Sequence, residues 1–151
     1  MNNRLENIVD LKKYPIQDLN SSLIKKLIKK CKNDLNQFSC SIIPNFILPK
    51  SLKIMNAELE QQIDEVYMSR ESINPYLNSN DDPSLEKHHP KRIFSKRYNG
   101  YLNSDLFEKN SEMKFLYEQE ELLKFVSACV GISPIYRWAD PLACHAYNIM
   151  K

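Results

Sequence analysis

Residues 142–151 read LACHAYNIMK, and this stretch decides the fold class more than any other part of the chain. Its alternation has the two-residue period of a β-strand, in which successive side chains point to opposite faces. One face is expected to carry Ala143, His145, Tyr147 and Ile149, and the other Leu142, Cys144, Ala146, Asn148 and Met150. Because both faces are largely apolar and few other segments have a strand pattern, the sequence predicts an incomplete sheet.

Helical patterns dominate the chain upstream of this strand. Residues 22–36 place apolar side chains on one face and lysines on the other, which predicts an amphipathic helix. A second helix is expected over 50–68, with Pro49 in its first turn, where a missing N–H is tolerated. Residues 106–130 are expected to be helical in two pieces, ended by Gly131.

The remaining segments are expected to be extended or irregular. Residues 38–42 alternate apolar residues with serines, which predicts a half-buried strand. Residues 92–103 are expected to be extended around a turn at Gly100. Asn, Ser, Asp and Pro are frequent in residues 69–91, which predicts a long mobile loop of a kind that is often functional.

Composition limits the class of protein. A length of 151 residues predicts one domain, 1–151, and a net charge of +2 predicts no nucleic-acid partner. The N-terminus is not a secretory signal and no apolar run approaches the ~18 residues of a membrane span, so no membrane partner and a cytoplasmic location are expected. The only glycines, Gly100 and Gly131, cannot build a phosphate-binding loop or a dinucleotide fingerprint.

Cysteines and histidines give no metal-binding pattern. The cysteines have no CxxC spacing and are expected to be buried free thiols: Cys31, Cys40, Cys129 and Cys144. His88 and His89 are adjacent, so their side chains diverge in extended backbone and chelate poorly. His145 is expected to be a packed core histidine. No metal ligands and no catalytic residues are therefore assigned to this chain.

Two stretches resemble the Fe(II)/2-oxoglutarate-dependent oxygenases. Residues 43–49, IPNFILP, resemble the turn that joins the first strand of that family to a long helix. Residues 135–151, IYRWADPLACHAYNIMK, resemble the strand pair that leads into its double-stranded β-helix, a jelly-roll or cupin-like fold. The similar branch acts on free amino acids and contains radical halogenases and hydroxylases.

The resemblance implies an α+β fold with a helix-rich N-terminal region and the first strands of a double-stranded β-helix. It implies Fe(II) and 2-oxoglutarate as cofactors, and a dioxygenase that hydroxylates or halogenates a small-molecule substrate. The family holds iron with a His-x-Asp or His-x-Gly motif and a distal histidine. The chain has no His-x-Asp, and by the family pattern the motif lies beyond Lys151. The chain is therefore expected to be a truncated fragment that is inactive and binds neither cofactor tightly.

Five residues are candidates for ligand contacts if the resemblance holds. Arg97, and after it Arg92, suit the carboxylate of an amino acid because a guanidinium binds a carboxylate bidentately. Asp140 is a candidate acceptor for the amine. Tyr147 and Asn148 are assigned to the cofactor cavity because their strand is nearest to the expected metal site. Each has a structural alternative, namely a surface ion pair, a turn or core packing.

The lysines of residues 22–36 give an alternative function. They could make the chain a small non-catalytic α+β module that binds another protein. A solvated helix face is the plainer interpretation, because acidic residues elsewhere nearly cancel the charge. The sequence also allows a homodimer.

Overall fold

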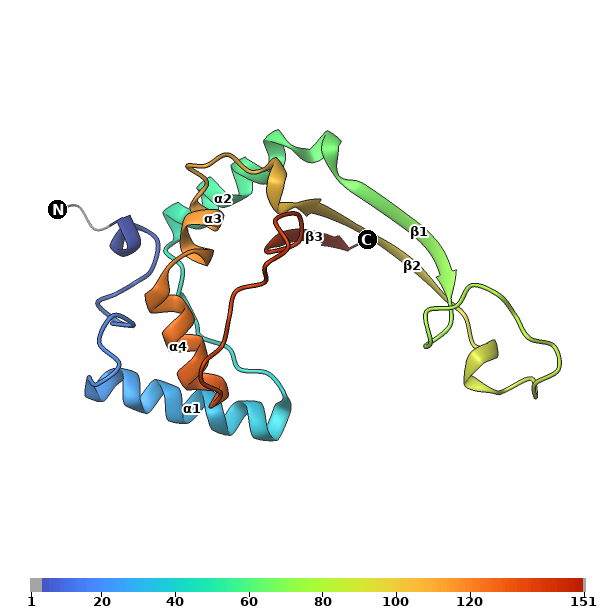
Figure 1. Ribbon diagram of the computed structural model, residues 1–151, viewed down its shortest axis with the longest axis horizontal. Coiled ribbons are helices and arrows are strands. Elements are labelled where there is room, and N and C mark those ends of the chain that lie inside the picture. The colour runs from blue at the N-terminus through green and yellow to red at the C-terminus, as the bar shows by residue number, and fades with distance from the viewer. Residues whose placement is uncertain (1–3, 151) are drawn as a thin grey trace.

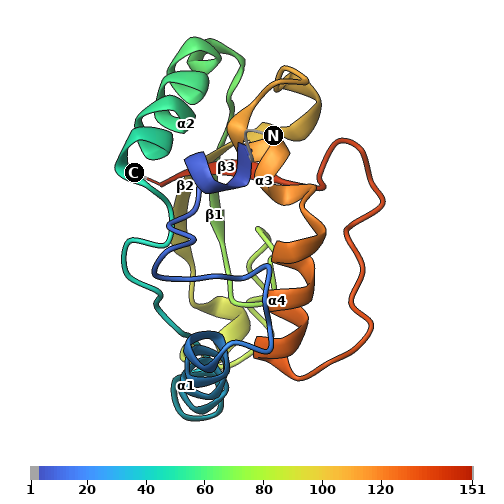
Figure 2. The same ribbon diagram turned by 90° about the vertical axis from the view of Figure 1, so that its left-hand side faces the viewer.

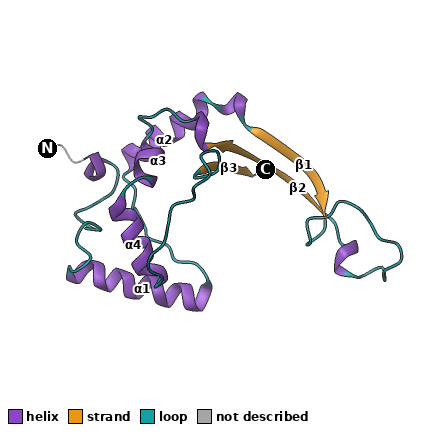
Figure 3. Ribbon diagram, viewed as in Figure 1, coloured by secondary structure: helices purple, strands orange, loops and turns teal. Residues whose placement is uncertain are grey.

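The computed structural model describes residues 4–150 and has a mixed α+β architecture (Figures 1 and 3). The helices gather at one end, and an antiparallel sheet extends away from them. The α-helices are α1 (Ser22–Phe38), α2 (Pro49–Gln61), α3 (Glu112–Tyr117) and α4 (Glu120–Val130). The strands are β1 (Tyr67–Ile73), β2 (Ser95–Asn103) and β3 (Ala146–Met150). Short 3₁₀ helices cover Arg4–Asn7, Ile63–Glu65, Pro90–Arg92 and Ser104–Leu106.

The helix expected over 22–36 is confirmed as α1. The Ser21 hydroxyl accepts a hydrogen bond from the Ile24 N–H at 3.3 Å and caps the first turn. Ile24 and Cys31 are buried on the apolar face, as the periodicity predicts. Two helical pieces form within 106–130, as α3 and α4, although residues 107–111 are not helical, and Gly131 ends α4 with a φ of 75°. The helix expected over 50–68 forms as α2 but ends at Gln61, because Tyr67 and Met68 pair with β2 as the start of β1.

The half-buried strand expected at residues 38–42 does not form. Phe38 is the last residue of α1, and Ser39 takes a left-handed conformation with a φ of 56°. The side chains of Phe38 and Ile42 are 65% and 72% exposed, and Cys40 is exposed as well. A strand needs a neighbouring strand to satisfy its backbone groups, and no strand in the described part of the chain lies beside this segment. Three alternating apolar residues are therefore not enough to form a strand.

The sheet has the order β1-β2-β3, with both pairings antiparallel. The strand expected over 142–151 is confirmed for residues 146–150, while 142–145 form a turn and a bend and Lys151 lies outside the described residues. Tyr147 lies opposite Leu102, and Ile149 opposite Gly100, so these two residues of β3 share a face as predicted. β2 is therefore the central strand, and β1 and β3 are the edges.

Gly100 does not form the expected turn, because it lies inside β2. A Cβ atom added at Gly100 would lie 2.3 Å from Met68 Sδ and 2.7 Å from Val66 Cγ1. Real Cβ atoms essentially never come so close to other heavy atoms, so the glycine here makes room for the side chains beside β1.

The hydrophobic core lies among the helices and the N-terminal segment. Its buried members are Leu5, Ile8, Val9, Tyr14, Ile16, Ile24, Cys31, Met55, Leu116, Phe125 and Cys129. The sheet reaches this core only at its helical end, where Tyr147 packs against it. On the opposite face of the sheet, next to the Leu102–Tyr147 pair, Tyr67 and Tyr101 are exposed although their ring centroids lie 5.3 Å apart. The sheet therefore has little cover of its own.

The total solvent-accessible surface area of the chain is larger than that of a compact protein. The chain exposes 11032 Å², whereas a compact monomer of this length exposes about 8,000 Å². Figure 1 shows the reason, because the sheet curves away from the helices and ends in the segment between β1 and β2. None of the described helices combines the length and the apolar character that a bilayer span needs.

Candidate functional site

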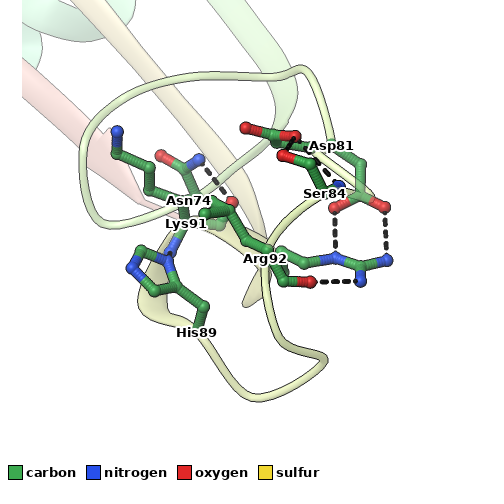
Figure 4. A network of polar contacts seen from close by, with 8 residues as sticks. Asn74, Asp81, Ser84, His89, Lys91 and Arg92 are labelled. Atoms are coloured by element: carbon green, nitrogen blue, oxygen red, sulfur yellow. Dashed lines mark hydrogen bonds and ion pairs between the residues drawn. The ribbon is translucent and has the colours of Figure 1, made fainter.

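The segment between β1 and β2 holds Arg92 in a local network (Figure 4). The guanidinium donates through Nε and Nη2 to the two carboxylate oxygens of Asp81, each at 2.9 Å, and through Nη1 to the Leu85 carbonyl at 3.0 Å. Arg92 keeps the pKa of Asp81 below its ordinary value. All three nitrogens of Arg92 therefore have partners within its own loop, and a substrate carboxylate would have to displace Asp81.

Asn74 fixes the start of the same loop. Its side-chain oxygen accepts from the backbone N–H groups of Tyr76 and Asn78, and its amide donates to the Lys91 carbonyl at 2.7 Å. The loop expected over 69–91 therefore begins later than predicted, because residues 69–73 belong to β1.

Asp140 occupies a turn. Its carboxylate accepts from the backbone N–H of Leu142 at 2.9 Å, a local bond typical of an Asx-turn. The side chain is exposed and lies before β3. Its second oxygen is still available to a donor, so the structure gives Asp140 a local role and leaves its ligand role as a prediction.

His145 and Tyr147 form an aromatic cluster with Phe107. The ring centroid of Phe107 is 5.4 Å from that of His145 and 5.1 Å from that of Tyr147. The Tyr147 hydroxyl donates to the Met55 carbonyl at 3.0 Å, and burial, together with Glu58, raises the pKa of Tyr147 to about 12. The structure thus gives Tyr147 the core-packing role.

His145 is buried, as expected. Burial, followed by the positive charge of Lys114, lowers the pKa of its imidazole, which favours the neutral ring. Nδ1 lies 3.3 Å from Cys144 Sγ, and Nε2 is buried with no hydrogen-bond partner among the described residues. The ring lies among aromatic neighbours, so the structure gives His145 the core-packing role that the sequence predicted.

Arg97 and Asn148 share the open face of the sheet. Arg97 lies opposite Glu71, and Asn148 lies opposite Tyr101, which is on the same face of β2 as Arg97. Both side chains are exposed, and no hydrogen bond of Arg97 is found among the described residues. With a strand rise of about 3.3 Å per residue, they are roughly 13 Å apart along β2. Of the five candidates, these two remain open to a ligand on a common surface.

Asn99 is a member of this face that the sequence did not single out. It lies between Arg97 and Tyr101 in β2, about 7 Å from Arg97 along the strand. Its Oδ1 is buried and has no partner among the described residues. A buried acceptor without a donor is costly, so a ligand donor at this position would be favourable. Only the strand register, which periodicity alone does not fix, could have identified it.

The described residues do not form a metal centre. Among residues 4–150, no three His, Cys, Asp or Glu side chains lie close enough together to hold a metal ion. All four cysteines are free, as expected. Cys31 in α1 and Cys129 in α4 are buried where the two helices pack together. Cys40 is exposed and Cys144 is only partly buried, contrary to the expectation. Burial, followed by Cys31, raises the pKa of Cys129 to about 12, so it is a neutral thiol. The described side chains therefore do not fit an iron site.

No protein-family model matches this chain, and no curated protein matches its sequence.

Proposed function

We propose that this chain is the N-terminal part of an Fe(II)/2-oxoglutarate-dependent oxygenase-like protein that hydroxylates or halogenates a small substrate such as a free amino acid. The observation that carries the proposal is the uncovered antiparallel sheet, because it exposes apolar and polar side chains that a second layer of structure would cover. In this proposal β1, β2 and β3 are the first strands of a double-stranded β-helix. The order of helices, the IPNF turn and strands supports the same assignment.

The proposed substrate contacts lie on the open face of β2 and β3. A zwitterionic amino acid needs a cation for its carboxylate and an acceptor for its amine. Arg97 provides an exposed guanidinium, and Asn99 Oδ1 on the same face is an acceptor without a donor that the substrate amine would reach once the groups that bury this atom move aside. Arg97 suits a carboxylate because its N–H groups form a fork that matches two oxygens. Asn148 extends this polar surface toward the edge strand.

Iron and 2-oxoglutarate are assigned to sequence C-terminal to Lys151, because the described residues do not provide a ligand set. There the metal, with oxygen and 2-oxoglutarate, would supply the oxidation of an unactivated carbon. The residues of this chain would bind and orient the substrate, and the helices would support the sheet. The isolated 151 residues are expected to have no oxygenase activity.

The reading frame beyond Lys151 tests the proposal most directly. It is expected to encode a His-x-Asp or His-x-Gly within about twenty residues, and the extended protein is expected to convert 2-oxoglutarate to succinate only with Fe(II). A frame without either motif, or an extended protein without this turnover, would overturn the proposal.

A matched pair of variants in β2 tests the substrate contact in the extended protein. Arg97→Ala is expected to raise the KM for the substrate about tenfold or more, because a charge-assisted hydrogen bond is lost. Lys96→Ala is the control, since residue 96 points to the opposite face of the same strand. Equal effects of the two substitutions would exclude Arg97 as a substrate ligand.

A second candidate is a non-catalytic protein-interaction module that uses the lysines of α1. These lysines are all exposed, and among the described residues only Lys30 has an acidic partner, Asp34, at 2.5 Å. This candidate requires the 151 residues to fold cooperatively on their own. A sharp thermal transition by circular dichroism would favour it, and a broad transition would count against it.

A further inference from the structure

A groove of about 600 Å³ lies between α1, α4 and the segment that follows α4, far from the open face of the sheet. Figure 2 shows α1 and α4 side by side, and this segment continues from the end of α4. The volume is in the range of sites that hold small organic ligands. The apolar wall consists of Leu19, Ile28, Leu123, Ala128, Ile132 and Ile135.

The charged residues on the rim of this groove are mainly basic. Lys32 comes from α1 and Lys124 from α4, and among the described residues neither ammonium has a hydrogen-bond or ion-pair partner. The one carboxylate on the rim, Glu120, is paired with Arg137 at 2.8 Å. The groove therefore combines an apolar wall with two cations whose charge is not balanced locally.

The segment that closes one side of the groove is held in place by specific bonds. The Gly131 N–H donates to the Ser127 carbonyl at 2.9 Å, and the Ser127 hydroxyl donates to the Ile132 carbonyl at 2.5 Å. Arg137 then donates to the carbonyls of Tyr117 and Glu118. Because the backbone is anchored on both sides, Ile132 stays beside the groove although its side chain is 62% exposed.

Lys32 is well placed to meet an anion at one end of the groove. A Cβ atom at Gly131 would lie 3.8 Å from both Cε and Nζ of Lys32, so the lysine lies along the end of α4. Lys32 is exposed, so its ammonium is accessible to a ligand. Lys124 is exposed on α4 and lines the same groove.

We propose that this groove binds a small amphiphilic carboxylate, with its aliphatic chain on the apolar wall and its carboxylate at the basic rim that Lys32 and Lys124 form. Charge complementarity selects the anion, since the only rim carboxylate is neutralised by Arg137. The site is independent of the oxygenase proposal, because it shares no residue with the open face of the sheet.

Calorimetric titration of the 151-residue chain with decanoate, below its micellar concentration, tests the site. Decanoate is expected to bind with one-to-one stoichiometry, and decylammonium, which has the same chain with the opposite charge, is expected to bind at least tenfold more weakly. Equal binding of the two amphiphiles would show that the rim lysines do not select the ligand, and would overturn the proposal.

Substitutions of the two rim lysines test whether decanoate binds in this groove. Lys32→Met and Lys124→Met are each expected to weaken decanoate binding about tenfold, because each removes a charged partner. Lys53→Met, at an exposed position of α2, is the control and is expected to leave the affinity unchanged. Affinities that are the same in all three variants would contradict the site.

A matched pair of variants tests the contribution of the apolar wall to decanoate binding. Ile132→Asp places a carboxylate on the groove at an exposed position, so the fold is expected to survive while decanoate binding is lost. Ile42→Asp is the control at another exposed isoleucine and is expected to bind normally. Sedimentation tests a rival occupant, because a dimer that Ile132→Asp dissociates would make the groove a contact between two copies and overturn the ligand proposal.

Discussion

His145 has the most restrictive surroundings of the three histidines. Its ring lies between Phe107 and Tyr117, with ring centroids 5.4 Å away on each side. His88 is exposed and His89 only partly buried, in the loop before β2. Burial favours the neutral form of His145, whereas an unfolded chain exposes the same ring to water. The protonation of this one side chain is therefore coupled to folding.

The stability of the chain is expected to fall as the pH drops below about 6.5, the value of an unperturbed histidine. The pKa of His145 is lowered in the folded state, so the unfolded chain binds more protons in this range and acid favours unfolding. Urea unfolding between pH 5 and pH 8 measures the effect. His145→Phe is expected to reduce this pH dependence, and His88→Gln, at an exposed position, is expected to keep it. The same slope in wild type and His145→Phe would show that other groups cause it.

At the level of elements, a side chain of α2, Glu58, caps the N-terminus of α3 and so links the two helices. The carboxylate of Glu58 in α2 accepts from the Ser111 hydroxyl and from the Glu112 N–H, both at 2.8 Å. Ser111 is itself the N-cap of α3, and its hydroxyl accepts from the Lys114 N–H. One carboxylate thus satisfies an orphan donor of a short helix and fixes its position on α2.

Glu58→Ala is expected to lower the free energy of unfolding by about 1–2 kcal/mol, because it leaves the first turn of α3 without this acceptor. Glu60→Ala is the control in the same helix, where the side chain is exposed, and should change stability by less than about 0.5 kcal/mol. Urea denaturation of both variants measures the difference. Similar losses for the two would mean that the cap contributes nothing.

Arg92→Ala is expected to loosen the loop between β1 and β2 without a large effect on overall stability. The substitution removes the fork to Asp81 and the bond to Leu85, but an ion pair this exposed contributes little to global folding. Hydrogen exchange should become faster in residues 76–92 and stay unchanged in α1 and α4. Fast exchange of this loop already in the wild type would show that the network does not order it.

The sequence pattern correctly predicted helices, whose formation depends on residues within one segment. It failed for one expected strand, because strand formation depends on pairing with another part of the chain. α1 and α4 were predictable because their apolar periodicity and end residues act within one segment. Residues 38–42 have a strand pattern, but residues 4–150 contain no strand beside them with which they could pair. The sequence does not distinguish Arg92 from Arg97 as a ligand for a carboxylate. The fold shows that Arg92 is paired with Asp81, whereas the side chain of Arg97 is exposed.

At the scale of the whole molecule, the sheet curves away from the helices (Figure 1). We therefore expect the chain to have a larger radius of gyration in solution than a compact monomer. A compact chain of 151 residues has a radius of gyration of about 15 Å. Small-angle scattering of the 151-residue chain is expected to give a clearly larger value, because its surface exceeds that of a compact monomer. A radius near 15 Å would show that the sheet folds back onto the helices and is already covered.

The position of β2 in the sheet also sets an order of events during synthesis and folding. β1 and β2 are close in sequence, so their hairpin closes at a modest entropic cost, whereas β3 pairs with β2 from more than forty residues downstream. As a ribosome releases the chain, the hairpin emerges well before its third strand. Until β3 arrives, Leu102 lacks Tyr147 as its neighbour and β2 presents an unpaired edge. During this interval the free edge of β2 can pair with another chain, so an aggregation hazard exists that ends at this edge when β3 pairs with it.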